Sequence, residues 1–179
     1  MKNKKFIVIF ALIMVIAFGG TVMAFMVHKS VNKTNTFIPA AVSCEVEETF
    51  ADNSKSSITV KNTGNIDAFI RVRLVTYWVN SEGNTVGKPG EMPHFTIADG
   101  WIKGENNTYY CTAKVAAETS TPTLLGSSIN LETSSEGYRQ VVEVFAEAVQ
   151  AEPYEQSGGK YISSAAKDAW GVELEKPAT

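Results

Sequence analysis

Strict alternation of apolar and polar residues marks the middle of the chain. Between residues 68 and 75 the even positions hold Ala, Ile, Val and Leu, and the odd positions include Arg71 and Arg73. A period of two residues places the apolar set on one face of a β-strand and both arginines on the other. The turn sequence Asn-Thr-Gly-Asn at 62–65 separates this strand from a second alternating run at 58–61. The pattern therefore predicts two strands joined by a turn.

The chain after residue 85 is rich in turns, with short strand-like segments between them. Three such segments lie around and beyond the turn at 104–107, at residues 101–102, 109–113 and 128–132. We predict that the aromatic side chains of Trp101, Tyr109 and Tyr110 pack in the core or across strands.

Residues 139–151 fit two patterns. The even positions from 142 to 148 hold Val, Val, Ala and Ala in alternation with other residues, which is typical of a strand. Val141, Phe145 and Val149 also satisfy helical spacing, and the Ala and Glu content favours a helix. The pattern alone leaves both interpretations open.

A small, Ala-rich stretch at 163–170 predicts a short helix, with Ser163 or Ser164 as its N-cap and Gly171 after its end. Many short strands separated by turns, followed by one terminal helix, are typical of a β-sandwich. We therefore predict a mainly β fold, a jelly-roll-like β-sandwich with a short C-terminal helix.

The first 24 residues have the pattern of a secretory signal peptide, which forms a hydrophobic signal helix before the domain. Three lysines within the first five residues precede an apolar run at 6–18, and a glycine pair follows. Val22 and Ala24 occupy the −3 and −1 positions, so cleavage is predicted between Ala24 and Phe25. The mature protein is then secreted.

The alternative is that this segment stays uncut. Residues 6–27 are 22 uncharged positions, enough to cross a bilayer of about 30 Å at about 1.5 Å per residue. The preceding positive charges then predict that residues 28–179 face outward. The organisation we expect is a signal peptide at 1–24, an extended N-terminal segment at 25–35 and a β-sandwich domain at 36–179.

Charge narrows the range of partners. Without the first 24 of its 179 residues, the chain has 155 residues, the size of one domain. Three of the 16 Lys and Arg residues are lost, so 13 basic residues oppose 19 acidic ones and the net charge is −6. Such a surface disfavours nucleic acid and anionic lipid. A membrane is expected as a partner only through the uncut N-terminal segment, and Glu45, Glu47 and Glu48 are interpreted as solvated.

The sequence contains few residues suited to catalysis or metal binding. His28 and His94 have no ligand partner at helical or strand spacing, and the common nucleophile, phosphate-binding, zinc and calcium motifs are missing. We therefore predict that the protein is not an enzyme and uses no metal or other cofactor.

Cys44 and Cys111 are the two cysteines, and both lie in strand-like contexts. Export permits a disulfide, and closing so long a loop would contribute roughly 4 kcal/mol in the chain-entropy model. Two separate buried thiols fit the sequence equally well.

Several stretches in order resemble the TasA/camelysin-type exported proteins of Gram-positive bacteria. They are Gly19-Gly20-Thr21-x-x-Ala24-Phe25, Asn35-Thr36-Phe37, Val42-Ser43-Cys44-Glu45-Val46, residues 62–72, Tyr109-Tyr110, and residues 144–151 with 169–172. The resemblance implies a signal peptide cut by a dedicated SipW-type signal peptidase. It also favours a strand over a helix at 139–151.

The resemblance further implies a jelly-roll domain that builds fibres of a biofilm matrix, with itself or a homologous matrix subunit as partner. In such fibres the segment freed by cleavage enters the next subunit as a missing strand. Phe25, Val27 and Val31 share one strand face and are the predicted plugs, with Lys29 interrupting that face. The alternative is that residues 25–35 are merely a flexible exported N-terminus.

This chain departs from the family pattern in three ways. It is shorter than the main fibre protein, it has two cysteines, and Met26-Val27-His28-Lys29 replaces a Thr- and Asp-containing stretch after the cleavage site. An accessory fibre component or a cell-surface relative therefore also fits.

Three classes of function follow from the sequence. The first is a structural protein of the matrix or cell surface that polymerises by strand donation. The second is a monomeric secreted adhesin or ligand-binding module with exposed aromatic residues at Tyr77, Trp78, Trp101 or Tyr109. The third is a secreted hydrolase, which no catalytic motif in the sequence supports.

Overall fold

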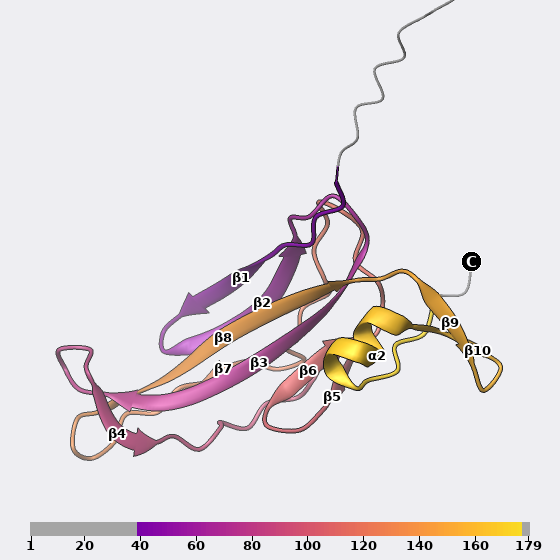
Figure 1. Cartoon of the computed structure of the whole chain (residues 1–179). Coiled ribbons are helices and arrows are strands. Elements are labelled where there is room, and N and C mark those ends of the chain that lie inside the picture. The colour runs from indigo at the N-terminus through magenta and orange to yellow at the C-terminus, as the bar shows by residue number, and fades with distance from the viewer. Residues whose placement is uncertain (1–38, 177–179) are drawn as a thin grey trace, which may run out of the picture. The chain divides into compact units, whose positions relative to one another are not determined.

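The computed structural model describes residues 39–176, which form antiparallel β-strands and one short C-terminal helix (Figure 1). The strands are β1 (Cys44–Ala51), β2 (Ser54–Asn62), β3 (Ala68–Val79), β4 (Thr85–Pro89), β5 (Trp101–Lys103), β6 (Thr108–Cys111), β7 (Ile129–Asn130), β8 (Arg139–Gln150), β9 (Tyr154–Ser157) and β10 (Lys160–Ser163). Helix α2 spans Ser164–Trp170. The predicted mainly β class with a C-terminal helix is confirmed, and the predicted signal helix lies outside the described residues.

Two sheets and a hairpin make up the described part. The first sheet has the order β1-β2-β7. In the second sheet β3 is central: β8 pairs with it along its whole length, and β4 and β6 share its other edge, with β5 beyond β6. Strands β9 and β10 pair with each other.

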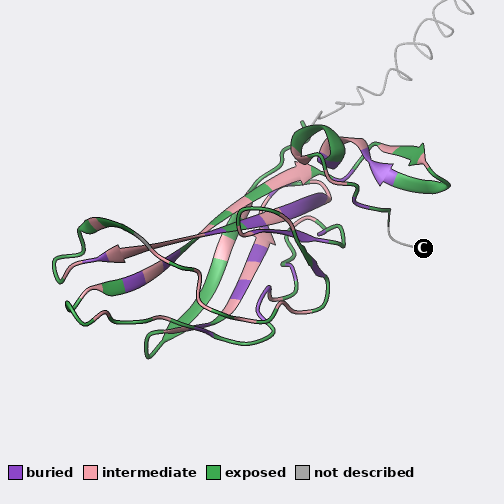
Figure 2. Ribbon diagram, turned by 90° about the horizontal axis from the view of Figure 1, so that it is seen from below, coloured by how far each residue is buried: buried purple, intermediate pink, exposed green. Residues whose placement is uncertain are grey.

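The main core lies between these two sheets. Ile58 and Val60 of β2 and Ile70, Val72 and Leu74 of β3 are almost completely buried in one cluster. Figure 2 shows buried positions alternating with half-buried and exposed ones along the strands. The face predicted from the alternation at 68–75 is therefore the core face, because the first sheet covers it.

A second, smaller core lies on the opposite face of the second sheet. Phe69 is completely buried there beside Ala166 of α2 and Leu174. Arg71 follows on the same face, where its guanidinium lies 5.1 Å from the ring of Trp170 and pairs with Glu147 at 2.7 Å. Helix α2 therefore covers only the part of this face near the start of β3.

Residues 139–151 form a strand rather than a helix. β8 pairs with β3 residue by residue, from Ala68 opposite Gln150 to Val79 opposite Arg139. The ladder satisfies backbone groups along one edge of β8 and sets the strand conformation over the helical propensity of Ala and Glu.

The helix predicted at 163–170 is confirmed, with caps that explain its short length. The Ser163 hydroxyl accepts a hydrogen bond from the Ala166 N–H at 3.3 Å, as an N-cap does. Gly171 ends the helix with a φ of 68°, a left-handed conformation that glycine adopts without strain.

Candidate functional site

Two sheet edges lie next to each other without pairing. β1 is the outer strand of the first sheet, and β8 is the outer strand of the second. Cα atoms of the two strands come within 8 Å, yet among residues 39–176 no ladder joins them (Figure 1). The start of β8 pairs on this side with residues 132–133, through the Thr133–Arg139 bridge and the Gln140 N–H bond to the Glu132 carbonyl. Beyond that end, both strands present backbone N–H and C=O groups that lack a strand partner on this side. We call this region the seam.

The seam is lined by apolar side chains that are only partly covered. They pack against the main core but stay partly exposed, and they are Cys44 and Val46 of β1 and Val144, Ala146 and Ala148 of β8. Their counterparts on the inner strands β2 and β3 are fully buried. The core is thus incompletely covered along the seam, as expected where a further strand would fit.

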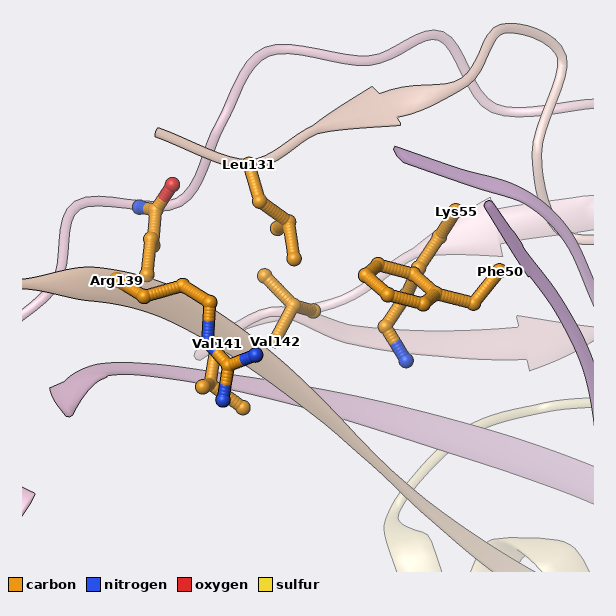
Figure 3. A pocket seen from close by; sticks show the side chains of 7 residues that line it. Phe50, Lys55, Leu131, Arg139, Val141 and Val142 are labelled. Carbon is orange, nitrogen blue, oxygen red and sulfur yellow. The ribbon is translucent and has the colours of Figure 1, made fainter. Parts of the chain in front are cut away.

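One end of the seam opens into a cavity of about 220 Å³. Its lining joins the end of β1 to the start of β8 and comprises Phe50, Lys55, Leu131, Arg139, Gln140, Val141 and Val142 (Figure 3). Phe50 is 52% exposed, although its ring lies at an apolar wall. An apolar cavity of about 150 Å³ accommodates a benzene ring, so this one has room for a large apolar side chain.

An ion pair lies on the core-facing side of β1 and β2, and its acidic member remains exposed at the sheet edge. Glu48 lies opposite the buried Ile58 in the β1–β2 ladder, and its carboxylate pairs with the ammonium group of Lys55. Lys55 is only 8% exposed because a bulge at Thr49/Phe50 shifts the register and brings it to the inner face. Inward-pointing charges are a common way in which proteins prevent indiscriminate pairing at sheet edges.

The chain entering β1 is held by the turn that the sequence predicted at 62–65. The N–H groups of Thr63 and Gly64 donate to the Ser43 carbonyl at 3.0 and 3.2 Å, and the Asn65 N–H donates to the Ala41 carbonyl at 3.1 Å. A Cβ on Gly64 would lie 2.4 Å from that carbonyl oxygen, so only glycine permits this approach. The turn therefore places the start of the described chain at the Cys44 end of the seam.

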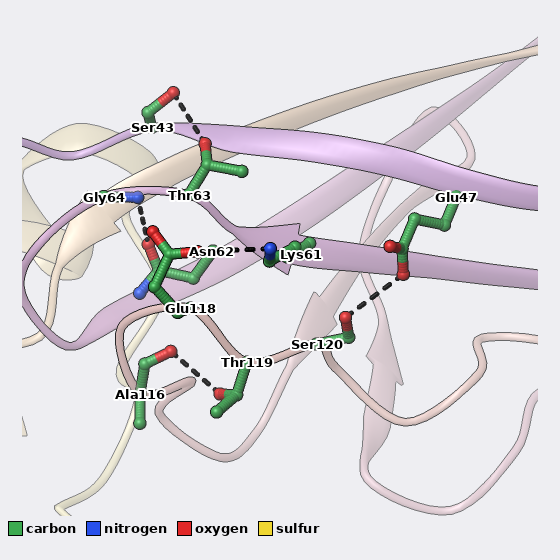
Figure 4. A network of polar contacts seen from close by, with 10 residues as sticks. All are labelled: Ser43, Glu47, Lys61, Asn62, Thr63, Gly64, Ala116, Glu118, Thr119 and Ser120. Carbon is green, nitrogen blue, oxygen red and sulfur yellow. Dashed lines mark hydrogen bonds and ion pairs between the residues drawn. The ribbon is translucent and has the colours of Figure 1, made fainter.

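A polar network on the outer side of the first sheet also holds β1 in place, in addition to the turn at 62–65 (Figure 4). Lys61 pairs with Glu118 at 3.1 Å, and Glu47 accepts a hydrogen bond from the Ser120 hydroxyl at 3.1 Å. These contacts tie β1 and β2 to the loop that follows β6. The network stabilises β1 from the side away from the seam.

Not all residues that the sequence singled out lie in this region. The predicted cleavage residues Ala24 and Phe25 and the predicted plugs Phe25, Val27 and Val31 lie outside the described residues. The sequence did not predict that Phe50, Lys55 and Leu131 line a cavity. For Lys55 the reason is that the bulge that turns it inward has no sequence signal. Glu48 is exposed, as interpreted from the sequence, and its carboxylate also pairs with Lys55.

Both cysteines are free thiols in this structure. Cys44 is half-buried on β1 and Cys111 is fully buried on β6. Burial raises the pKa of the Cys44 thiol, with a smaller contribution from the nearby Glu147 carboxylate. Burial likewise raises the pKa of the Cys111 thiol.

Alkylation tests these thiols. Because both pKa values are raised, less thiolate is present at neutral pH, so iodoacetamide should label the native protein more slowly than the urea-unfolded protein. Labelling should accelerate as the pH rises, because the thiolate fraction increases, and Cys44 should react before the buried Cys111. Mass spectrometry of the modified peptides gives both rates. Thiols that stay unlabelled in urea until a reductant is added would instead reveal a disulfide between them.

The four aromatic residues predicted as possible ligand contacts are mostly covered by the rest of the domain. Trp101 and Tyr109 are 7% and 2% exposed, which confirms the prediction that they pack in the core. Trp101 also donates its indole N–H to the Pro122 carbonyl at 3.1 Å. The alternative prediction that Trp101 and Tyr109 are exposed ligand contacts was therefore wrong. Tyr77 and Trp78 are half-buried.

Between residues 39 and 176 no group of three or more His, Cys, Asp or Glu side chains is arranged to hold a metal ion. No helix in that range has the length and hydrophobicity needed to span a membrane.

Comparison with known proteins adds no relative. No family model matches the chain, and neither a curated protein nor a solved structure gives a significant match. The seam and the sequence motifs are therefore the features that bear on function.

Proposed function

We propose that this protein is a secreted structural component of a cell surface or extracellular matrix that assembles by strand donation. The observation that carries the proposal is the seam, where the edges of β1 and β8 lie unpaired over half-buried apolar side chains. An extended peptide that joins a sheet edge gains main-chain hydrogen bonds, and its alternate side chains fill the pockets below. A copy of the same chain, or a homologous subunit, is the partner.

Residues 25–35 are the donor segment in this proposal. Cleavage after Ala24 by a signal peptidase would free Phe25 as the first residue, and Phe25, Val27 and Val31 would form the apolar face that enters the seam. The donated strand would extend the two sheets toward a complete jelly-roll-like sandwich. Burying the seam lining stabilises such a complex by roughly 25 cal/mol for each Å² of apolar surface removed from water.

The direct test compares two forms of the protein by negative-stain microscopy and sedimentation. The mature chain 25–179 is expected to form fibres or oligomers. The same chain beginning at Thr36, which keeps every described residue, is expected to stay monomeric. Monomers from both forms, or fibres from both, would contradict strand donation by residues 25–35.

A matched pair of substitutions in the donor segment separates strand insertion from a general effect of charge. Val27→Asp places a carboxylate on the apolar face and should prevent assembly. Ser30→Asp places the same carboxylate on the other face and should leave assembly unchanged. Equal loss in both variants would mean that the segment does not act as an alternating strand.

A monomeric binding module is the second candidate. The outer face of the second sheet, beyond the reach of α2, exposes the Phe145 ring to 43%, with the Arg73 guanidinium 5.8 Å from it. This face predicts that Phe145→Ala removes ligand binding without changing assembly. Under strand donation, Phe145→Ala changes neither property, because the residue points away from the seam.

A further inference from the structure

The inner face of β1 carries a specific order of side chains. Cys44 and Val46 are apolar, Glu48 is acidic and Phe50 is apolar, at every second position. Val46 and Glu48 lie opposite the fully buried Val60 and Ile58, so both belong to the face toward the core. Phe50 and the Glu48 partner Lys55 line the cavity at the open end of the seam.

The donor segment carries the same order with the opposite charge. Phe25 and Val27 are apolar, Lys29 is basic and Val31 is apolar, again at every second position. Lys29 therefore interrupts the apolar face of the donor in the same way as Glu48 interrupts that of β1. The valines lie two residues to either side of Lys29, and Val46 and Phe50 lie two residues to either side of Glu48.

We propose that Lys29 of one copy pairs with Glu48 of the next and thereby sets the register of the donated strand. This inference rests on the proposed strand donation. With Lys29 opposite Glu48, the two valines meet Val46 and Phe50 whether the donor runs parallel or antiparallel to β1. One valine then reaches the cavity beside Phe50 in either direction.

Other registers are disfavoured by simple electrostatics. A shift by two residues would place a valine over the Glu48 carboxylate and bury the Lys29 ammonium group against Val46 or Phe50. Covering a charge without a partner costs far more than a surface contact gains. A shift by one residue would turn the apolar face of the donor to solvent. Glu48 has two carboxylate oxygens, so it can accept from Lys55 and from Lys29 together.

A charge-swap experiment on the mature chain 25–179 tests the pairing. Lys29→Glu should raise the critical concentration for assembly about tenfold, the factor expected for loss of one such ion pair. Glu48→Lys should do the same, and the double variant with both substitutions should recover assembly to within about twofold of the unmodified chain. Sedimentation across a concentration series measures all three.

Matched controls place the same charges elsewhere. Lys33→Glu combined with Glu48→Lys should not recover assembly, and neither should Lys29→Glu combined with Glu45→Lys, since Glu45 points away from the core. Thermal unfolding shows whether Glu48→Lys, which opposes Lys55, still folds. If it does not, neutral variants serve: Lys29→Gln should weaken assembly of the unmodified chain and have no further effect in a Glu48→Gln background.

The outcomes separate this inference from the function on which it rests. If deletion of 25–35 abolishes assembly but Lys29→Glu assembles normally, strand donation stands and the Lys29–Glu48 register is wrong. Recovery by the control combinations equal to that of the true swap would also overturn the register. If the deletion itself assembles like the mature chain, strand donation fails first.

Discussion

Replacing Asn62 with alanine is expected to lower the free energy of unfolding by about 2–4 kcal/mol, because its completely buried side chain makes three hydrogen bonds to backbone groups. The Asn62 side chain is completely buried at the end of β2. Its amide nitrogen donates to the carbonyls of Ile66 and Val115 at 2.8 and 2.9 Å, and its carbonyl accepts from the Gly64 N–H at 3.0 Å. Urea denaturation followed by tryptophan fluorescence measures the change.

Asn65→Ala is the matched control for this substitution. Asn65 belongs to the same turn and also makes two hydrogen bonds, accepting from the Ala41 N–H at 2.7 Å and donating to the Pro39 carbonyl at 2.9 Å. Asn65 is exposed, so water can replace the lost partners and the expected cost is below about 1 kcal/mol. Equal losses in the two variants would show that burial of the Asn62 network does not govern its contribution.

Replacing Phe69 with alanine is expected to lower the free energy of unfolding by about 3–5 kcal/mol, the usual range for a buried phenylalanine. Phe69 is 0% exposed and fills the space between β3 and α2, where Ala166 and Leu174 are also buried. These residues are small or already packed, so they cannot collapse into the space that the ring leaves. The transition should therefore move to markedly lower urea concentration.

Phe145→Ala provides the same chemical change on the same sheet face. Its ring is 43% exposed because α2 does not extend over it. The expected loss is below about 1 kcal/mol, and a comparable loss for both phenylalanines would contradict the assignment of a second core under α2. Circular dichroism of Phe69→Ala at low urea should also show whether α2 detaches before the main sandwich unfolds.

The apolar lining of the seam and its ion pair have opposite effects on the binding of a further strand. Its half-buried apolar lining favours a further strand, whereas the inward Glu48–Lys55 pair penalises any strand that brings only apolar side chains to that position. Under the proposed strand donation such an edge would be selective, because a matching donor carries a complementary charge at one defined place. An edge lined only by apolar residues would instead pair with many sequences.

Local patterning was sufficient for several elements of the fold. The alternation at 68–75 predicted the core face of β3, because a strand projects successive side chains to opposite faces whatever surrounds it. Ser163 and Gly171 predicted the limits of α2, since capping depends on neighbouring backbone groups. The buried positions of Trp101 and Tyr109 also followed from the strand-like segments around them.

Residues far apart in the chain decided the rest. Phe69 shares a face with Arg71, and the docking of α2, about a hundred residues later, buries Phe69 completely but leaves Arg71 partly exposed. The strand at 139–150 required its ladder with β3 to overcome helical propensity. The hairpin β9–β10 was not predicted, because its sequence has no clear alternating pattern. The seam is the extreme case: periodicity identifies an apolar strand face, but which strands end at a sheet edge is decided by pairing across the whole domain. The charge pattern of residues 25–31 can be read from the sequence alone. Its proposed counterpart on β1 requires the tertiary structure, in which the register shift at Thr49/Phe50 brings Lys55 beside Glu48.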